Sequence, residues 1–408
     1  MATPIIPFRK PTALRKPNVF RKPVTDTDTA DTATAEHITE VNLTFEQVEA
    51  LGRELDDLRA RVVADLGQKD RDYLYNIVRI QRGLEVGGRG LMYLGFLPPA
   101  WLAGVAALSV SKILDNMEIG HNVMHGQYDW MREDNYNSRE FEWDNVCPGD
   151  QWKHSHNYLH HTFTNIVDMD RDIGYGILRM AREQEWRPYY LGNLAYATAL
   201  MFLFEWGVML HDLEADNLLS GKRKWADVKD LAKGMYRKAR KQALKDYVIF
   251  PLLTGPLFVS TLLGNATANV VRNVWAYSII FCGHFPTGTQ TFTKEECENE
   301  SRGQWYLRQM LGSANIEGST LFHIMSGNLS HQIEHHLFPD IPASRYPAMA
   351  VEVREICERY GMPYNTGSFS HQLWSTWTKI AKLSLPNSWT RDDNEIVVNI
   401  EREKEAAA

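Results

Sequence analysis

The sequence predicts an all-helical integral membrane protein, in which two helical hairpins enter the membrane and a helical cap lies on its cytoplasmic side. Three observations predict this fold. Apolar stretches occur in two groups, at about residues 90–114 and 247–283. A segment rich in Lys and Arg lies between them, at residues 222–245, and marks a cytoplasmic loop. The rest of the chain is polar, with 23% charged residues overall, so the membrane segments are a minor part of it.

Composition narrows the class of protein further. The formal net charge is −7 over 408 residues, and no aromatic and basic stripe is present, which argues against nucleic-acid binding. The four cysteines are scattered without a CxxC pair, which argues against a disulfide framework and a cysteine zinc site. No apolar run follows the basic N-terminal residues, so we expect internal segments to direct membrane insertion.

Residues 1–42 are expected to form a disordered tail. Arg-Lys-Pro triplets begin at residues 9, 15 and 21, and a tract of Thr, Asp and Ala follows. Such frequent proline prevents a helix, and the segment has too little apolar surface to fold. The alternative is a basic arm that touches anionic lipid or an electron-donor protein.

The remaining chain divides into three parts. Residues 43–84 have leucines at helical spacing among many charges, which predicts cytosolic helix. Thr44 would cap its first turn, and Gln47 three residues later would complete a capping box. Residues 85–385 are assigned to the membrane domain and residues 386–408 to a charged C-terminal tail.

The first apolar group is interrupted by a Pro-Pro pair at residues 98–99. It is either a single kinked span or a tight hairpin, whose helices are barely long enough for a hydrocarbon core of ~30 Å. The second group is expected to form a hairpin that turns near Gly264-Asn265. Two hairpins make about four spans and return both chain ends to the cytoplasmic side. We expect the bacterial cytoplasmic membrane.

A third apolar stretch, residues 190–213, is interrupted by three ionisable residues, Glu205, His211 and Asp212. Ionisable groups inside a lipid-facing span are costly. The stretch is therefore predicted to be an interfacial or pocket-lining helix.

Most of the fourteen histidines fall into three clusters. They are His121 with His125, His156 with His160 and His161, and His331 with His335 and His336. Each cluster contains a pair four residues apart, which places two imidazoles on one helical face. One such pair is usually surface polarity, but three clusters on one side of a membrane indicate a metal site. This number of imidazoles exceeds the three or four ligands of a zinc site, and it suits two metal ions. Among the metals that bind imidazole, iron is the one that oxygen chemistry in a membrane favours.

The motifs around these histidines resemble those of the membrane fatty-acid desaturase family. HxxxH, HNxxHH and QxxHH patterns are separated by two apolar groups. Gln-Trp-Lys precedes the second pattern, Thr-Phe-Thr-Asn follows it, and the third reads Gln-Ile-Glu-His-His-Leu-Phe-Pro from residue 332. The resemblance covers about residues 85–385. It is greatest to actinobacterial acyl-CoA desaturases, which include Δ9 stearoyl-CoA enzymes and are often grouped with the linoleoyl-CoA type.

The resemblance implies a di-iron centre. Its implied ligands are His121, His125, His156, His160, His161, His284, Gln332, His335 and His336. Gln332 stands where many relatives have histidine, and its carbonyl oxygen can bind iron or hold a bound water. His331 is an alternative ligand, four residues before His335. Asp170 and Asp172 belong either to a solvated acidic loop or to the groups that orient metal-bound imidazoles, for which Asn165 and Asn315 are further candidates.

The implied reaction uses O2 and two electrons to place a cis double bond in a long-chain acyl-CoA, first of all stearoyl-CoA at Δ9, or in an acyl-lipid. The chain has no HPGG haem motif, so the electrons would come from a separate NAD(P)H-dependent reductase or ferredoxin. The acyl chain would lie in an apolar tunnel. The basic residues 222–245 would either orient the protein in the membrane or attract the phosphates of coenzyme A.

The same residues are compatible with other functions. A front-end or linoleoyl-type desaturase and a lipid or alkyl hydroxylase would use the same histidine scaffold. A membrane metal-binding or transport protein would place ionisable residues near mid-membrane, whereas these histidines lie at span ends and in loops. A zinc metalloprotease would need HExxH, which the sequence lacks.

Overall fold

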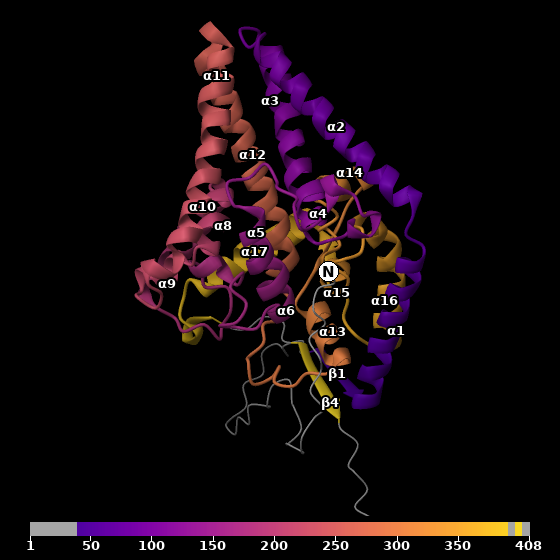
Figure 1. Ribbon diagram of the computed structural model, residues 1–408. Helices are drawn as coiled ribbons and strands as arrows, with labels where there is room; N and C mark the ends of the chain where they lie inside the picture. Colours follow the sequence, from indigo (N-terminus) through magenta and orange to yellow (C-terminus); the bar gives the residue numbers. More distant parts are fainter. Residues whose placement is uncertain (1–38, 391–395, 402–408) are drawn as a thin grey trace, which may run out of the picture.

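The computed structural model describes residues 39–390 and 396–401, and the tail expected before residue 39 lies outside them. Most described residues are helical, as predicted. Two helical hairpins project at one end of the molecule, and the other elements form a broader body (Figure 1).

The described chain ends pair with each other, which differs from the two tails expected there. Strand β1 (Thr39–Thr44) runs parallel to β4 (Ile396–Glu401). Val41 and Leu43 alternate with exposed or partly exposed residues and are buried in the core. This period of two is the pattern of a half-buried strand. Neither strand is long enough to be evident before its distant partner is known.

Helix α1 (Phe45–Ala64) begins with the predicted capping box. Thr44 Oγ1 accepts from the Gln47 backbone at 3.1 Å, and Gln47 Oε1 accepts from the Thr44 backbone at 2.8 Å. The helix buries its leucine face against α13 (Arg302–Leu311) and α16 (Tyr346–Arg359). It therefore forms part of the body, and the predicted helix and its capping box are confirmed.

The first apolar group is a hairpin and not a kinked span. Its arms are α2 (Gln68–Met92) and α3 (Pro98–Ile113), so the first arm begins inside the segment expected to be cytosolic. Gly88 and Gly104 let the two backbones approach, because a Cβ at Gly88 would lie 3.1 Å from the Gly104 carbonyl oxygen. Helix α3 continues through a π-helix, Leu114–His121, into α4 (Asn122–Met124).

The second hairpin turns earlier than predicted, and the expected turn at Gly264-Asn265 is wrong. The first arm is α10 (Trp225–Leu244), a π-helix (Lys245–Ile249) and α11 (Phe250–Leu253). The chain turns at Gly255–Leu257, and α12 (Phe258–His284) runs unbroken to the site. Most of the basic segment expected to be a loop is therefore helix α10.

Tertiary contacts explain why α12 continues through residues that often end helices. A Cβ at Gly264 would lie 3.0 Å from Met92 Sδ, so the glycine permits close packing on the first hairpin. Asn265 donates to the Asp246 carbonyl oxygen at 2.6 Å. The turn falls instead at Gly255, whose φ of +55° suits glycine, followed by a proline.

Within the described ranges, no helix taken singly has both the length and the apolar composition of a membrane span. One pair has them together, Pro188–Phe202 with Phe204–Asp212, and it is bent by 102°. It contains α7 (Asn193–Phe202) and α8 (Phe204–Asp212), the stretch predicted to be interfacial or pocket-lining.

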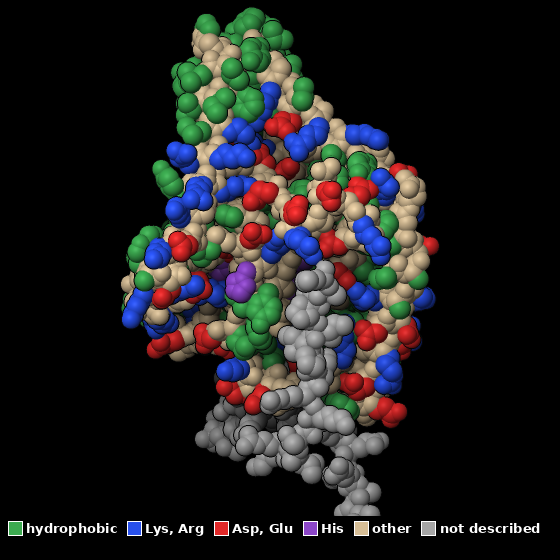
Figure 2. Space-filling view, in the orientation of Figure 1, with side chains coloured by type: hydrophobic (Ala, Val, Ile, Leu, Met, Phe, Trp, Pro, Cys, Tyr) green, Lys and Arg blue, Asp and Glu red, His purple; other side chains and the backbone are tan. Residues whose placement is uncertain are grey.

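Large apolar side chains are exposed at the tips of both hairpins. Figure 2 shows them as a hydrophobic patch at one end of the molecule, with Lys and Arg side chains below it. They include Tyr93, Leu94, Phe96, Leu97 and Leu102 of the first hairpin and Leu252, Leu253, Val259 and Leu263 of the second. An apolar patch of this kind marks a surface that contacts lipid or another protein.

The remaining elements build the body around the lower end of α12. They are α5 (Gly149–Trp152), a π-helix (Lys153–His160), α6 (His161–Phe163), α9 (Ala215–Leu219), β2 (Asn315–Glu317), α14 (Thr320–Met325), α15 (Gln332–Leu337), β3 (Thr366–Ser368) and α17 (Phe369–Leu383). Strands β2 and β3 form a second short parallel pair. Single turns of 3-10 helix join several of these elements.

Candidate metal centre

The first two histidine clusters meet His335 and His336 of the third, together with His284, at one buried place between the hairpin bases and the body. The donor atoms of one group, His121, His125, His156 and His335, all lie within 4.8 Å of one another. A second group at the same spacing consists of His160, His284 and His336. Segments more than 200 residues apart in the chain therefore supply two adjacent sets of imidazoles.

His161 lies between the two groups. Its ring centroid is 4.7 Å from that of His125 in the first group and 4.6 Å from that of His336 in the second. Neither of its ring nitrogens has a hydrogen-bond partner among the described residues. The eight predicted histidines thus form one continuous cluster.

Local backbone geometry brings these side chains together. Two of the histidine segments, Leu114–His121 and Lys153–His160, are π-helical, a form that is rare and frequent at functional sites. At the end of α12, a Cβ at Gly283 would lie 2.8 Å from Gln332 Oε1. Glycine at this position therefore lets α15 approach α12 closely enough to place its histidines beside His284.

The cluster contains many buried nitrogens that lack a partner. The Nε2 atoms of six histidines of the cluster have none among the described residues: His125, His156, His160, His161, His335 and His336. Leaving a buried polar atom unpaired costs about 1–3 kcal/mol. Imidazole nitrogens that face one another without partners fit bound transition-metal ions.

The opposite ring nitrogens are held by the protein. His160 Nδ1 donates to both oxygens of Asp170, at 3.0 and 2.9 Å. His156 Nδ1 lies 3.4 Å from Asp172, whose other oxygen accepts from His211 at 3.0 Å. Holding Nδ1 in this way fixes the ring and leaves Nε2 for a metal, which is the usual arrangement of metal-bound histidine.

The two predicted asparagines act at a distance from the imidazoles. The Asn165 backbone donates to Asp170 at 2.8 Å, and its side chain holds two carbonyl oxygens. Asn315 accepts from the Ile333 backbone at 2.9 Å and donates to Glu334. Both therefore fix the backbone beside the histidines, and neither is bonded to a ring.

Sequence reasoning missed four other groups at Nδ1 atoms, one of which is the Thr164 hydroxyl, 3.3 Å from His336 Nδ1. His121 Nδ1 donates to Asn122 at 3.0 Å, and His336 Nδ1 donates to Gln309 at 3.1 Å. The Tyr346 hydroxyl lies 3.5 Å from His335 Nδ1. Asn122 was visible inside the first motif, whereas Gln309 and Tyr346 come from separate helices with no motif of their own.

The sequence left open whether Gln332 or His331, both in the third cluster, faces the metal centre. Gln332 Nε2 lies 3.2 Å from His284 Nε2, and Gln332 Oε1 is buried without a partner among the described residues. The His331 ring instead lies 4.6 Å from that of His323, and His331 belongs to neither group of converging donors. The geometry favours Gln332 as the residue that faces the centre.

The environment sets the charge of these imidazoles. Burial lowers the pKa of His125, His161, His335 and His336 well below the usual value, and the neighbouring imidazoles lower it further. They are therefore neutral, which is the form that binds metals. Burial also opposes the charged form of His160, but Asp170 and Asp172 outweigh it and raise its pKa to about 8.

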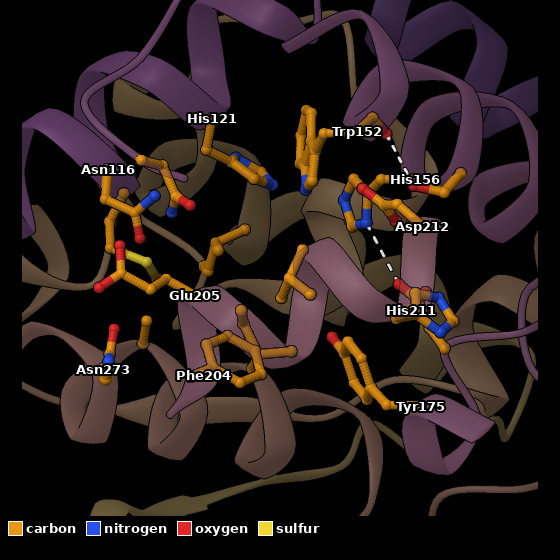
Figure 3. Close-up of a pocket in the computed structure, with 18 of the residues that line it drawn as sticks. Asn116, His121, Trp152, His156, Tyr175, Phe204, Glu205, His211, Asp212 and Asn273 are labelled. Atoms are coloured by element: carbon orange, nitrogen blue, oxygen red, sulfur yellow. Dashed lines mark hydrogen bonds and ion pairs between the residues drawn. The ribbon is translucent and has the colours of Figure 1, made fainter. Parts of the chain in front are cut away.

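A cavity reaches the cluster from the side of α8 (Figure 3). His121, His156, His284 and Gln332 form its wall at the cluster. The apolar side chains that line it include Met117, Phe204, Val208, Ala276, Ile280 and Leu329. The stretch predicted to line a pocket does so through α8.

Buried imidazoles with open nitrogens could hold metal ions, and they lie beside a cavity whose lining is partly apolar. The chain belongs to the fatty acid desaturase family, whose model matches residues 98–368. It is accordingly an oxidoreductase, and the resemblance predicted from the histidine motifs is confirmed.

Several individual desaturases are similar to this chain over much of its length. An NADPH-dependent stearoyl-CoA 9-desaturase of Mycobacterium tuberculosis is 47% identical over 86% of this chain and 83% of its own. An sn-1 linoleoyl-lipid 6-desaturase of Synechocystis is 27% identical over 65% of this chain and 75% of its own. Human fatty acid desaturase 3 is 26% identical over 53% and 46% of the two chains.

Proposed function

We propose that this protein is an O2-dependent desaturase that places a cis double bond at position 9 of a long-chain acyl-CoA, with stearoyl-CoA as its principal substrate. The observation that carries the proposal is the pair of adjacent histidine groups with unpartnered nitrogens beside an apolar cavity. The similarity to the mycobacterial stearoyl-CoA 9-desaturase supports the choice of substrate and position.

The eight histidines and Gln332 would hold two iron ions. His121, His125, His156 and His335 would surround one, and His160, His284 and His336 the other. His161 would complete the shell between the two groups, and Gln332 would contribute its buried carbonyl oxygen. Reduced iron with O2 supplies an oxidant able to remove hydrogen from unactivated methylenes.

The protein's own residues position the reactants. Asp170 and Asp172 hold two imidazoles with Nε2 turned inward, and Asn122 and Gln309 do the same for two others. The apolar walls of the cavity would bind the acyl chain, since burying each methylene contributes about 0.8 kcal/mol. Burial of the cluster keeps bulk water from the reacting carbons.

The arrangement of the molecule supports a membrane location. The two hairpins would enter the bacterial cytoplasmic membrane with their apolar tips, as about four membrane segments. The body, the centre and both chain ends would lie on the cytoplasmic side. Basic residues below the tips suit anionic lipid head groups (Figure 2). A separate NAD(P)H-dependent reductase or ferredoxin would dock on the body and supply electrons.

The test uses full-length protein produced with iron and purified in detergent. We expect about two irons per chain by elemental analysis, and oleoyl-CoA from stearoyl-CoA, O2, NADPH and a reductase. His160→Ala should lower the iron content and abolish the product, whereas exposed His371→Ala should change neither.

Four results would contradict the proposal. One zinc per chain, or unchanged iron in His160→Ala, would refute the di-iron centre. A hydroxylated product would assign the protein to the related oxygenases, and activity on acyl-lipids alone would refute acyl-CoA as the substrate.

A further inference from the structure

The cavity beside the histidines has two polar ends that differ in exposure (Figure 3). One end contains Asp212, which is partly exposed. The other contains Glu205, Asn116 and Asn273, which are all buried. A substrate with a large polar head group enters from an exposed end, so the acyl chain would point with its methyl end toward Glu205.

A buried ion pair closes the inner end. Arg272 Nη2 lies 2.6 Å from Glu205 Oε1, and the exposed fractions of the two residues are 1% and 6%. Arg272 also donates to Asn273 Oδ1 at 3.0 Å, and Asn273 donates to the Phe202 carbonyl oxygen at 2.9 Å. Helices α8 and α12 are thereby tied together across the end of the cavity.

A second cavity lies directly behind this pair. Glu205 lines both cavities, and Arg272 lines the second one. The second cavity is charged, with Lys112, Asp144 and Asp246 in its wall. Because the Glu205 and Arg272 side chains stand between the two cavities, their volume blocks an acyl chain from advancing into the second one.

We propose that the Glu205–Arg272 pair is the wall that limits how far the acyl chain extends beyond the metal centre, and that it sets the chain-length preference. Asn273 lies eleven residues before His284 on α12, which is roughly 16 Å along the helix axis. The carbons beyond the oxidised bond must fit into this fixed length. The inference rests on the proposed acyl-CoA desaturase function and names the residues that select its substrate.

The test compares kcat/KM for palmitoyl-, stearoyl- and arachidoyl-CoA. Glu205→Ala with Arg272→Ala should join the two cavities and raise the ratio of arachidoyl-CoA to stearoyl-CoA about tenfold, because two further methylenes can be buried. Glu205→Gln with Arg272→Met removes the charges but keeps the volume, and should leave the ratio near that of the wild type. Val208→Phe, one turn from Glu205, should shorten the cavity and favour palmitoyl-CoA.

The outcomes separate this inference from the proposed function. If the wild type desaturates no acyl-CoA, the proposed function fails first. If the wild type is active and the double alanine variant keeps its ratio, the wall is refuted. An equal shift in the volume-preserving variant would also refute it. If the double alanine variant does not fold, Val208→Phe decides: a shift toward palmitoyl-CoA supports the wall, and an unchanged ratio overturns it.

Discussion

The protein contains two polar clusters in its interior, the buried histidine centre and a partly buried ionic belt between the hairpins, and they differ in how their groups are paired. The belt contains Lys112, Asp144, Lys245, Asp246 and Arg89. Lys112 Nζ lies 2.7 Å from Asp246 and 3.6 Å from Asp144, and Arg89 lies 3.3 Å from Asp246. Each of these carboxylates therefore has a cation of the protein beside it, whereas the imidazoles of the centre face one another with open nitrogens.

This difference separates a structural cluster from a ligand site. The belt joins α2, α3 and the π-helix before α11, so its charges hold the two hairpins together. The centre pairs only the outer nitrogen of several rings and leaves the inner ones open. Removing a group from the belt should therefore cost folding stability, and removing one from the centre should cost metal binding.

The largest effect is expected from His335→Ala in the centre. The variant should lose metal and all desaturase activity, because its ring lies in the first donor group. The metal-free protein should lose less stability than Lys112→Met does, since no hydrogen bond to Nε2 of His335 is broken among the described residues. Elemental analysis and unfolding of the metal-free protein measure both, and a lower unfolding temperature without metal loss would reverse the assigned role.

Lys112→Met tests the belt. It leaves the buried Asp246 with fewer cations, and breaking a buried pair costs about 3–5 kcal/mol. We expect a clearly lower unfolding temperature in detergent, with normal iron content in the folded fraction. Exposed Lys229→Met is the matched control. Loss of iron at unchanged stability would place Lys112 in the centre's support instead.

A smaller effect is expected from Asp170→Asn, which weakens the group that orients His160. Replacing such a partner typically costs 10- to 100-fold in metal affinity. Competition with a chelator measures the change, and exposed Asp168→Asn serves as the neighbouring control. Equal affinities in the two variants would show that Asp170 acts only on the backbone of Asn165.

The smallest effect is a pH dependence of metal loading. His160 has its pKa raised to about 8, so it carries a proton at pH 7 that a metal must displace. Affinity should rise up to about tenfold per pH unit below pH 8 and then level off. The stability that this charge gives the metal-free protein is fully present below its unfolded pKa and is lost as the pH rises through about 8. Metal titration of the metal-free protein at several pH values measures the affinity, and unfolding of the metal-free protein at the same pH values measures the stability. A metal affinity that stays constant from pH 6.5 to 8 would contradict the raised pKa of His160.

Local patterns in the chain predicted much of the fold and the centre. Spacing of four residues identified the histidine pairs, and Thr44 with Gln47 identified the start of α1. These features depend on neighbours within one helical turn. Strand β1 was missed because its partner lies more than 350 residues away. The hairpin turn was misplaced because Gly264 and Asn265 are stabilised by contacts with the other hairpin and with Asp246.

By itself, the sequence determined which residue types the centre contains and which family the chain resembles, because motifs are local and imidazole chemistry is specific. Only the tertiary structure decided how the histidines divide into two groups, that Gln332 and not His331 faces them, and that Gln309 and Tyr346 lie at the outer nitrogens. It alone revealed the ion pair at the end of the cavity. The physical reason is that buried polar groups need partners, and those partners come from helices that meet only when the whole chain has packed.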